Sequence, residues 1–271
     1  MDKIKAIRRM PLGRALAAGL MWASWWVPPG TAAAGEMGPT TQPLVRLEGD
    51  GWNLGGRLEM GRRSLRTGEE LLKLDTRSLV FRAGARPLPF LHVWGQAGVA
   101  EADRLDADGS AGLAWAVGAG AALFEYVIKE SPVVGVQESI GLELHAFYRV
   151  STSDLPPVVA ETEADAASGL QEDLELTWKD ARVLPLFVYR VNRLGTALWR
   201  PYEPTGYLLR GGPVYARTTG DYGDASLRED GDFGAVLGFD VRFDSGWMGR
   251  VEMTWFGGSD RELALGVHRY F

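Results

Sequence analysis

The C-terminal stretch GDFGAVLGFDVRFDSGWMGRVEMTWFGGSDRELALGVHRYF (residues 231–271) decides the fold, because its hydrophobic residues recur at every second position. Between residues 233 and 243 the odd positions are Phe, Ala, Leu, Phe, Val and Phe, while the even ones are mostly glycine or charged. The same alternation runs through 247–255 and 263–271, with short turns between. A period of two is the period of a β-strand. The stretch therefore predicts three consecutive strands, each with one apolar and one polar face.

Strands of about ten residues with one apolar face are typical of transmembrane β-barrels, in which lipid-facing and lumen-facing residues alternate. In such barrels aromatic residues gather at the two membrane interfaces. The sequence predicts this position for four tryptophans: Trp52, Trp115, Trp247 and Trp255.

The last strand also carries a motif. The chain ends on Phe271, and the preceding apolar residues Leu263, Leu265 and Val267 are spaced two apart. This pattern resembles the C-terminal strand of bacterial outer-membrane β-barrels, although Arg269 stands where that group usually has Tyr. The resemblance implies that Leu263, Leu265, Val267 and Phe271 form the signal that the barrel-assembly machinery recognises.

The N-terminus predicts export. Residues 1–34 combine five basic residues, an apolar core at 15–27 and an Ala-Ala-Ala sequence at 32–34, as in a cleavable signal peptide. The expected organisation is a signal peptide at 1–34, a short lead-in at 35–51 and an outer-membrane β-barrel at 52–271. A soluble β-sandwich or lipocalin-like barrel, with the apolar faces turned inward, is the alternative.

Composition narrows the function classes. The chain has no cysteine and three histidines, which excludes disulfides and thiolate metal sites. Loss of residues 1–34 would take the formal charge from −6 to about −10, which argues against nucleic acid as a partner. We expect no cofactor and no bound metal; calcium held by acidic outer loops is a weak alternative.

Seven further strands are expected before residue 231, at about 52–63, 76–84, 90–101, 111–126, 134–150, from 174, and at about 206–217. The total is ten strands in a closed antiparallel up-and-down barrel, with eight as the alternative. Polar outer loops are expected at 64–75, 101–111, 151–171 and 218–231. In the strand from Leu174, the residues Leu174, Leu176 and Trp178 form the apolar face, and loss of phase near Pro185 predicts a bulge or bend there.

Eleven charged or histidine side chains are predicted to point into the lumen: Arg57, Glu59, Arg82, Glu143, His145, Arg149, Asp240, Arg242, Arg250, Glu252 and His268. The inner face of 111–126 consists of glycine and alanine, which leaves room for long side chains from elsewhere. A barrel of about ten strands is narrow, so these groups should fill it or leave a small passage.

Three functions compete. The first is a monomeric outer-membrane barrel, in contact with outer-membrane lipid, with a structural or small-solute passage role. The second is a barrel enzyme acting on lipid; such enzymes resemble one another in a His-x-Ser pair, but here the three histidines are followed at that spacing by Trp94, Phe147 and Tyr270. Ser139 is about 13 Å from Glu143 along an extended strand, which excludes a direct hydrogen bond to His145 within that strand but leaves open a nucleophile from a neighbouring strand. The third is a soluble periplasmic β-barrel binding protein.

Overall fold

The computed structural model describes residues 51–271 except 68–69, 105–107, 132–134, 156–173, 194–203, 230–232, 244 and 258–259. The predicted signal peptide and all but the last residue of the lead-in lie outside the described residues. Within the described part there is no helix long and apolar enough to cross a membrane.

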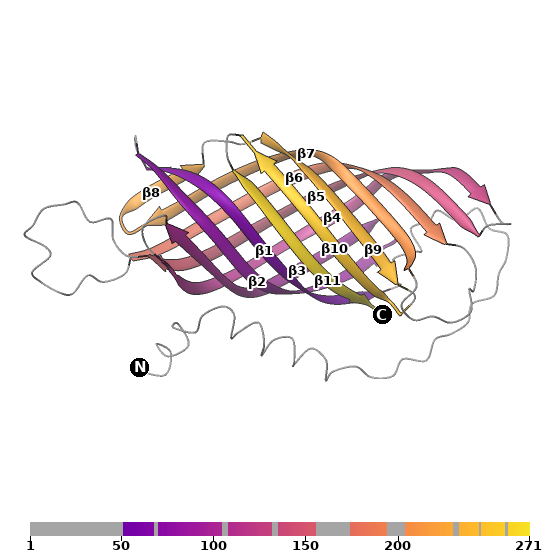
Figure 1. The fold of residues 1–271 in the computed structure, drawn as a ribbon, viewed down its shortest axis with the longest axis horizontal. Helices are drawn as coiled ribbons and strands as arrows, with labels where there is room; N and C mark the ends of the chain where they lie inside the picture. Colours follow the sequence, from indigo (N-terminus) through magenta and orange to yellow (C-terminus); the bar gives the residue numbers. More distant parts are fainter. Residues whose placement is uncertain are drawn as a thin grey trace, which may run out of the picture.

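Ten long strands form one closed antiparallel barrel (Figure 1). Each strand pairs with its neighbour in the chain, and β11 pairs with β1 from Asn53↔Tyr270 to Arg62↔Arg261, which closes the ring. The predicted fold class and the count of ten are thus confirmed. The strands are β1 (Trp52–Thr67), β2 (Glu70–Leu88), β3 (Leu91–Arg104), β4 (Ser110–Ser131), β5 (Val136–Leu155), β6 (Leu174–Arg193), β7 (Pro204–Tyr222), β9 (Phe233–Phe243), β10 (Trp247–Phe256) and β11 (Arg261–Tyr270).

Both ends of the barrel wall lie together, because β1 begins and β11 ends at the same rim; the Phe271 backbone N–H donates to the Trp52 carbonyl at 3.0 Å. We call this rim the terminus end and the opposite rim the loop end. Antiparallel closure leaves no sheet edge between β1 and β11, so the backbone donors and acceptors of both strands are paired.

The middle of the barrel is apolar outside and polar inside. Along β9, Phe233, Leu237 and Phe239 are exposed on the outer surface, while Val236 and Asp240 are buried inside. Trp52, Trp115, Trp247 and Trp255 are all exposed on the outer surface, and Leu265 and Val267 point outward from β11. An exterior belt of large exposed hydrophobic side chains is unfavourable in water and favourable in hydrocarbon.

Towards the loop end the pattern reverses. Leu65, Leu74, Leu155, Leu176 and Trp178 are at most 5 % exposed, because they point into the barrel. They belong to an interior group, the apolar cap, made of Leu65, Leu74, Val80, Ala100, Ala102, Ala114, Leu155, Leu176, Trp178, Tyr222 and Leu227. The apolar face that the sequence defines with Leu176 and Trp178 therefore points inward, opposite to the lipid-facing side expected for apolar faces in a transmembrane barrel. Beyond the apolar belt, the outer surface of the wall meets water. Apolar side chains there lower the free energy of the folded protein by packing inside the barrel.

The strands are also longer at this end than predicted. β1 and β2 run to Thr67 and from Glu70, so most of the outer loop expected at 64–75 is a strand hairpin. Much of 218–231 is likewise strand: β7 continues to Tyr222, turns at Gly223 (φ +55°) and returns as the short β8 (Ala225–Glu229). β8 pairs with β7 on one side and with Leu65 and Arg66 of β1 on the other. It closes the wall where β9, β10 and β11 do not reach.

Of the bulge or bend expected near Pro185, the described ladders show no bulge, although the β6–β7 pairing is interrupted between Val183↔Tyr215 and Phe187↔Gly211 and resumes in the same register. The β5–β6 register runs without a shift from Val136↔Arg193 to Leu155↔Leu174, through Leu144↔Pro185. The period-two pattern of the sequence is ambiguous there because both faces of the strand carry apolar residues. Leu184 and Leu186 are buried inside, while Val183 and Phe187 are exposed outside. Register shifts occur elsewhere, as at Ala122/Phe124 in β4, Ala85/Leu88 in β2 and Pro204/Gly206 in β7.

Leu176→Ala should lower the free energy of unfolding by about 2–5 kcal/mol, because it leaves a cavity in the apolar cap. Leu209→Ala, on the outer face of β7 where Leu209 is 46 % exposed, is the matched control and should cost less because lipid or detergent chains fill the space. Urea unfolding of the refolded protein measures both. Equal losses would show that the cap is not a packed core.

Candidate functional site: the lumen and its terminus-end pocket

Six charged side chains meet inside the barrel between the apolar cap and the pocket described below. This central cluster consists of three arginines and three acids: Arg63, Arg149, Arg182, Glu59, Asp180 and Glu262. Arg182 Nη2 lies 2.6 Å from both Asp180 Oδ2 and Glu262 Oε2. Arg149 Nη2 lies 2.8 Å from Asp180 Oδ2, and its Nη1 also pairs with Glu59. The formal charges of the cluster balance.

The pairs join opposite walls. Arg63 on β1 contacts Asp180 on β6 at 3.1 Å, and these strands are five places apart in either direction around the ring of ten. Arg149 on β5 and Glu262 on β11, 3.3 Å apart, are separated in the same way. Because Asp180 is fully buried and Arg63 is 3 % exposed, these contacts fill the lumen at this level.

Apolar side chains line the lumen next to the cluster. Leu184, Leu186 and Val188 of β6 pack with further residues of β7, β9 and β10, namely Val214, Ala216, Val236 and Phe256. The Phe256 ring lies 5.2 Å from the Arg63 guanidinium carbon and 5.1 Å from that of Arg182. Such cation–π contacts are favourable when they are desolvated.

Below the central cluster a second set of ion pairs leads towards the terminus end. Arg57 lies 2.7 Å from Glu59 and 2.9 Å from Glu252. Asp240 accepts from Arg250 at 2.8 Å and from Arg210 at 3.3 Å. Arg57 therefore connects the central cluster to this set.

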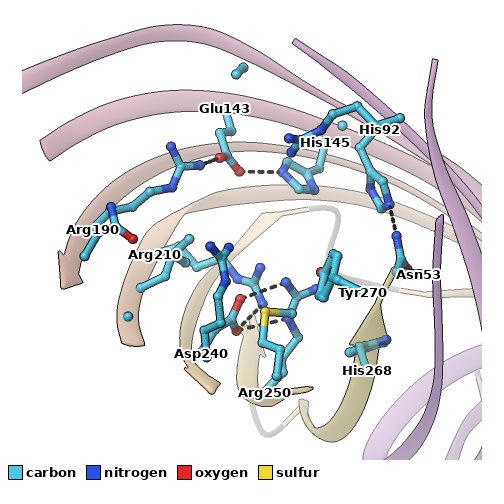
Figure 2. A pocket seen from close by; sticks show the side chains of 18 of the residues that line it. Asn53, His92, Glu143, His145, Arg190, Arg210, Asp240, Arg250, His268 and Tyr270 are labelled. Atoms are coloured by element: carbon cyan, nitrogen blue, oxygen red, sulfur yellow. Dashed lines mark hydrogen bonds and ion pairs between the residues drawn. The ribbon is translucent and has the colours of Figure 1, made fainter. Parts of the chain in front are cut away.

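A pocket lies at the terminus end, enclosed by the wall (Figure 2). It encloses about 1070 Å³, including the part open to solvent. Six arginines but two acids line it: Arg82, Arg86, Arg190, Arg210, Arg242 and Arg250 against Glu143 and Asp240. All three histidines of the chain, His92, His145 and His268, line it as well.

Glycines on β4 make room for large side chains of the neighbouring strands β3 and β5. A Cβ added to Gly120 would stand 3.0 Å from the His145 ring, and one on Gly118 would stand 2.4 Å from the Trp94 ring. Gly120 and Gly118 belong to the inner face of β4, so the small residues expected there do leave room for larger groups. Substituting either glycine would displace a side chain that lines or supports the pocket.

Glu143 and His145 form a local pair in this pocket. His145 Nε2 lies 2.8 Å from Glu143 Oε2, and the other carboxylate oxygen pairs with Arg190 (Figure 2). Catalysis by such a pair requires a nucleophile within hydrogen-bond reach. Among the described residues lining the pocket there is no serine, threonine, cysteine or lysine. Ser139, on the same strand, donates instead to Glu125 at 2.9 Å.

The structure places the eleven predicted lumen residues on the inside of the wall. It joins Arg57, Glu59, Arg149, Asp240, Arg250 and Glu252 through ion pairs and keeps Glu143 with His145 in a separate pair. Arg242 and His268 line the pocket, and Arg82 lies with its guanidinium carbon 3.9 Å from the Trp94 ring centroid. Within the described ranges, no three histidine or acidic groups come together as a metal site.

Other interior residues were missed, and most come from β6 and β7: Asp180, Arg182, Arg190 and Arg210. The sequence does contain a signal for the β6 residues of this set. They all have even numbers, as do Leu176 and Trp178, so they share one face of the strand. The sequence pattern defines an apolar face at Leu174, Leu176 and Trp178 and loses its phase near Pro185, so none of the charged residues of this strand was predicted to lie in the lumen. Arg63 and Glu262 also belong to the cluster, on the polar faces of their strands.

Comparison with known proteins gives similar folds at low sequence identity. No protein-family model and no curated protein matches the chain. Among solved structures, the translocator domain of the autotransporter NalP from Neisseria meningitidis has a TM-score of 0.41 and 13% identity, covering 84% of this chain and 91% of that one. The outer membrane protease OmpT from Escherichia coli has a TM-score of 0.36 and 10% identity, covering 82% and 97% respectively. The COG4313 outer membrane channel from Pseudomonas putida F1 has a TM-score of 0.35 and 8% identity, covering 86% of this chain and all of that one. These similarities are too low to assign an activity to this chain.

Asp180→Asn should destabilise the protein by about 3–5 kcal/mol, because it leaves the guanidinium groups of Arg63, Arg149 and Arg182 with less negative charge in a buried site. The matched control is Asp75→Asn: Asp75 pairs with Arg62 at 2.8 Å but is 45 % exposed, so its loss should cost less than about 1 kcal/mol. Urea unfolding compares the two. Similar costs would show that the central cluster is hydrated.

Proposed function

We propose that this chain is an integral β-barrel protein of the bacterial outer membrane whose lumen is closed to solutes. The observation that carries the proposal is the set of buried ion pairs joining β1 to β6 and β5 to β11 across the barrel. A lumen filled in this way supports a structural role and not the passage of solutes. Ligand access to it is limited to the terminus end.

The exterior supports the membrane part of the proposal. Large hydrophobic side chains such as Phe187, Phe233 and Val267 are more than half exposed on the outer surface. The exposed tryptophans occur near both edges of this belt; on β10, Trp247 and Trp255 lie at its two ends. The proposed lipid contact is this belt, and the proposed route is export by the N-terminal signal followed by insertion by the barrel-assembly machinery. In this orientation the terminus end faces the periplasm.

The ring supports a monomer. β1 and β11 of the same chain pair over ten residue positions, so closure needs no second copy. The residues of the proposed assembly signal, Leu263, Leu265, Val267 and Phe271, are on β11 or directly after it, and Leu265, Val267 and Phe271 are exposed outside. Arg269 also lies at this rim, with its guanidinium 5.1 Å from the Phe271 ring.

The interior supports closure. Open aqueous channels occur in barrels of 16–18 strands, whereas about eight strands leave an interior that side chains fill. In this ten-stranded barrel the apolar cap and the central cluster follow one another along the axis, and the β6–β10 hydrophobic group packs beside the cluster. The other two candidate functions have less support: the pocket lining provides no hydroxyl or thiol nucleophile beyond Tyr207 and Tyr270, and a soluble protein would not carry the apolar exterior.

The proposal predicts that the protein fractionates with outer membranes, migrates differently on gels before and after boiling, and gives no conductance steps in planar bilayers. An open porin reconstituted in the same way controls for insertion. Discrete, reproducible ion conductance from heat-modifiable protein would overturn the closed lumen, and recovery in the soluble periplasmic fraction would overturn the membrane assignment.

A further inference from the structure

We propose that the terminus-end pocket binds a small soluble anion with two or more negative charges on phosphate or carboxylate oxygens, and that Arg82 is its principal contact. The first support is charge. The six arginines and two acids of the lining give a formal charge of +4 with neutral histidines, and an excess of +2 remains when Glu125 and Glu252, which pair with Arg190 and Arg210 from beside the lining, are counted; the total of the chain is −6. Clefts lined by one sign of charge raise the local concentration of the opposite ion.

Arg82 is the second support. Its side chain is 7 % exposed and stacks on Trp94, with 3.9 Å between guanidinium carbon and ring centroid. Within the part of the chain that the structure describes, it has no hydrogen bond and no carboxylate partner. A buried charge needs a partner to be tolerated. A bound anion at Arg82 would supply one.

Two more buried donors adjoin the same pocket without acceptors. Among the residues that the structure describes, Asn192 Nδ2 and Arg210 Nε find no hydrogen-bond partner, and both residues line the pocket. By contrast, Arg190 and Arg250 already pair with Glu143 and Asp240 (Figure 2). Unsatisfied donors beside an excess of positive charge are the complement of an oxyanion, and the planar guanidinium fork matches carboxylate and phosphate oxygens.

The position of the pocket selects a soluble ligand. The strands of the wall separate it from the outer apolar belt, so a lipid headgroup does not reach it from the bilayer side. Its mouth is at the terminus end, where Pro89 and Phe90 are exposed, and its inner end meets the ion pairs of Asp240. The chemistry of the site stands on its own; only the compartment that supplies the ligand, the periplasm, rests on the proposed membrane orientation.

Calorimetric titration of the detergent-purified full chain with pyrophosphate, and separately with citrate, tests the proposal. We expect saturable binding of at least one of them, weakened by added salt. Arg82→Met should weaken binding about tenfold or more, because hydrogen bonds to charged groups are among the stronger ones. The matched control is Arg217→Met, an exposed arginine on β7 towards the loop end, which should bind as the unaltered protein does.

A second variant keeps the test decisive if Arg82→Met does not fold. Ala122→Asp adds a carboxylate to the pocket lining while Arg82 remains, and it should also weaken binding. The proposal is overturned if neither anion binds saturably to the unaltered protein, or if the folded pocket variants bind as tightly as Arg217→Met. These outcomes are independent of conductance, so a conducting protein that still binds the anion would overturn the closed lumen alone.

Discussion

The structure depends on guanidinium–carboxylate pairs that reach from one wall of the barrel to the other. Arg63 and Glu262 contribute from one side of the ring, on the paired strands β1 and β11, and Arg149 and Asp180 contribute from the opposite side, on β5 and β6. Charges in a site of low dielectric constant are tolerated only when they are paired and hydrogen-bonded. The three arginines and three acids of the central cluster are paired in this way. The pairs form only if opposite walls of the barrel stay close enough for the side chains to meet. The network therefore sets both the closure of the lumen and its width.

Around this network the same strands meet three environments in turn. At mid-height Leu237 and Val251 face outward and the charges face inward, as suits a wall between lipid and a polar core. Towards the loop end Leu65 and Leu176 face inward, as in a water-soluble barrel. At the terminus end the interior opens into the arginine-rich pocket. The alternative of a soluble barrel, with apolar residues inside, thus describes one end of the molecule correctly.

The alternation of the last three strands predicted their apolar and polar faces, and the same period of two along the seven expected strands before them gave the closed ten-stranded ring. It also put residues such as Glu59, Arg149 and Asp240 on the inner face. Alternation does not show whether the outer surface of a strand meets hydrocarbon or water. For Leu176 and Trp178 the outer medium is not hydrocarbon, so the apolar face turns inward and Asp180 and Arg182 follow it. The partners across the lumen are equally invisible in the sequence, since Arg63 and Asp180 are 117 residues apart.

A double-mutant cycle on Arg149 and Glu262, which pair between β5 and β11, tests the cross-lumen network most directly. Arg149→Met, Glu262→Gln and the combined variant are unfolded in urea and compared with the unaltered chain. The account predicts a coupling free energy of about 0.5–3 kcal/mol, as found for side chains in contact. A coupling of zero within error, with all three variants folded, would show that the two walls do not interact and that the lumen is not closed by this network.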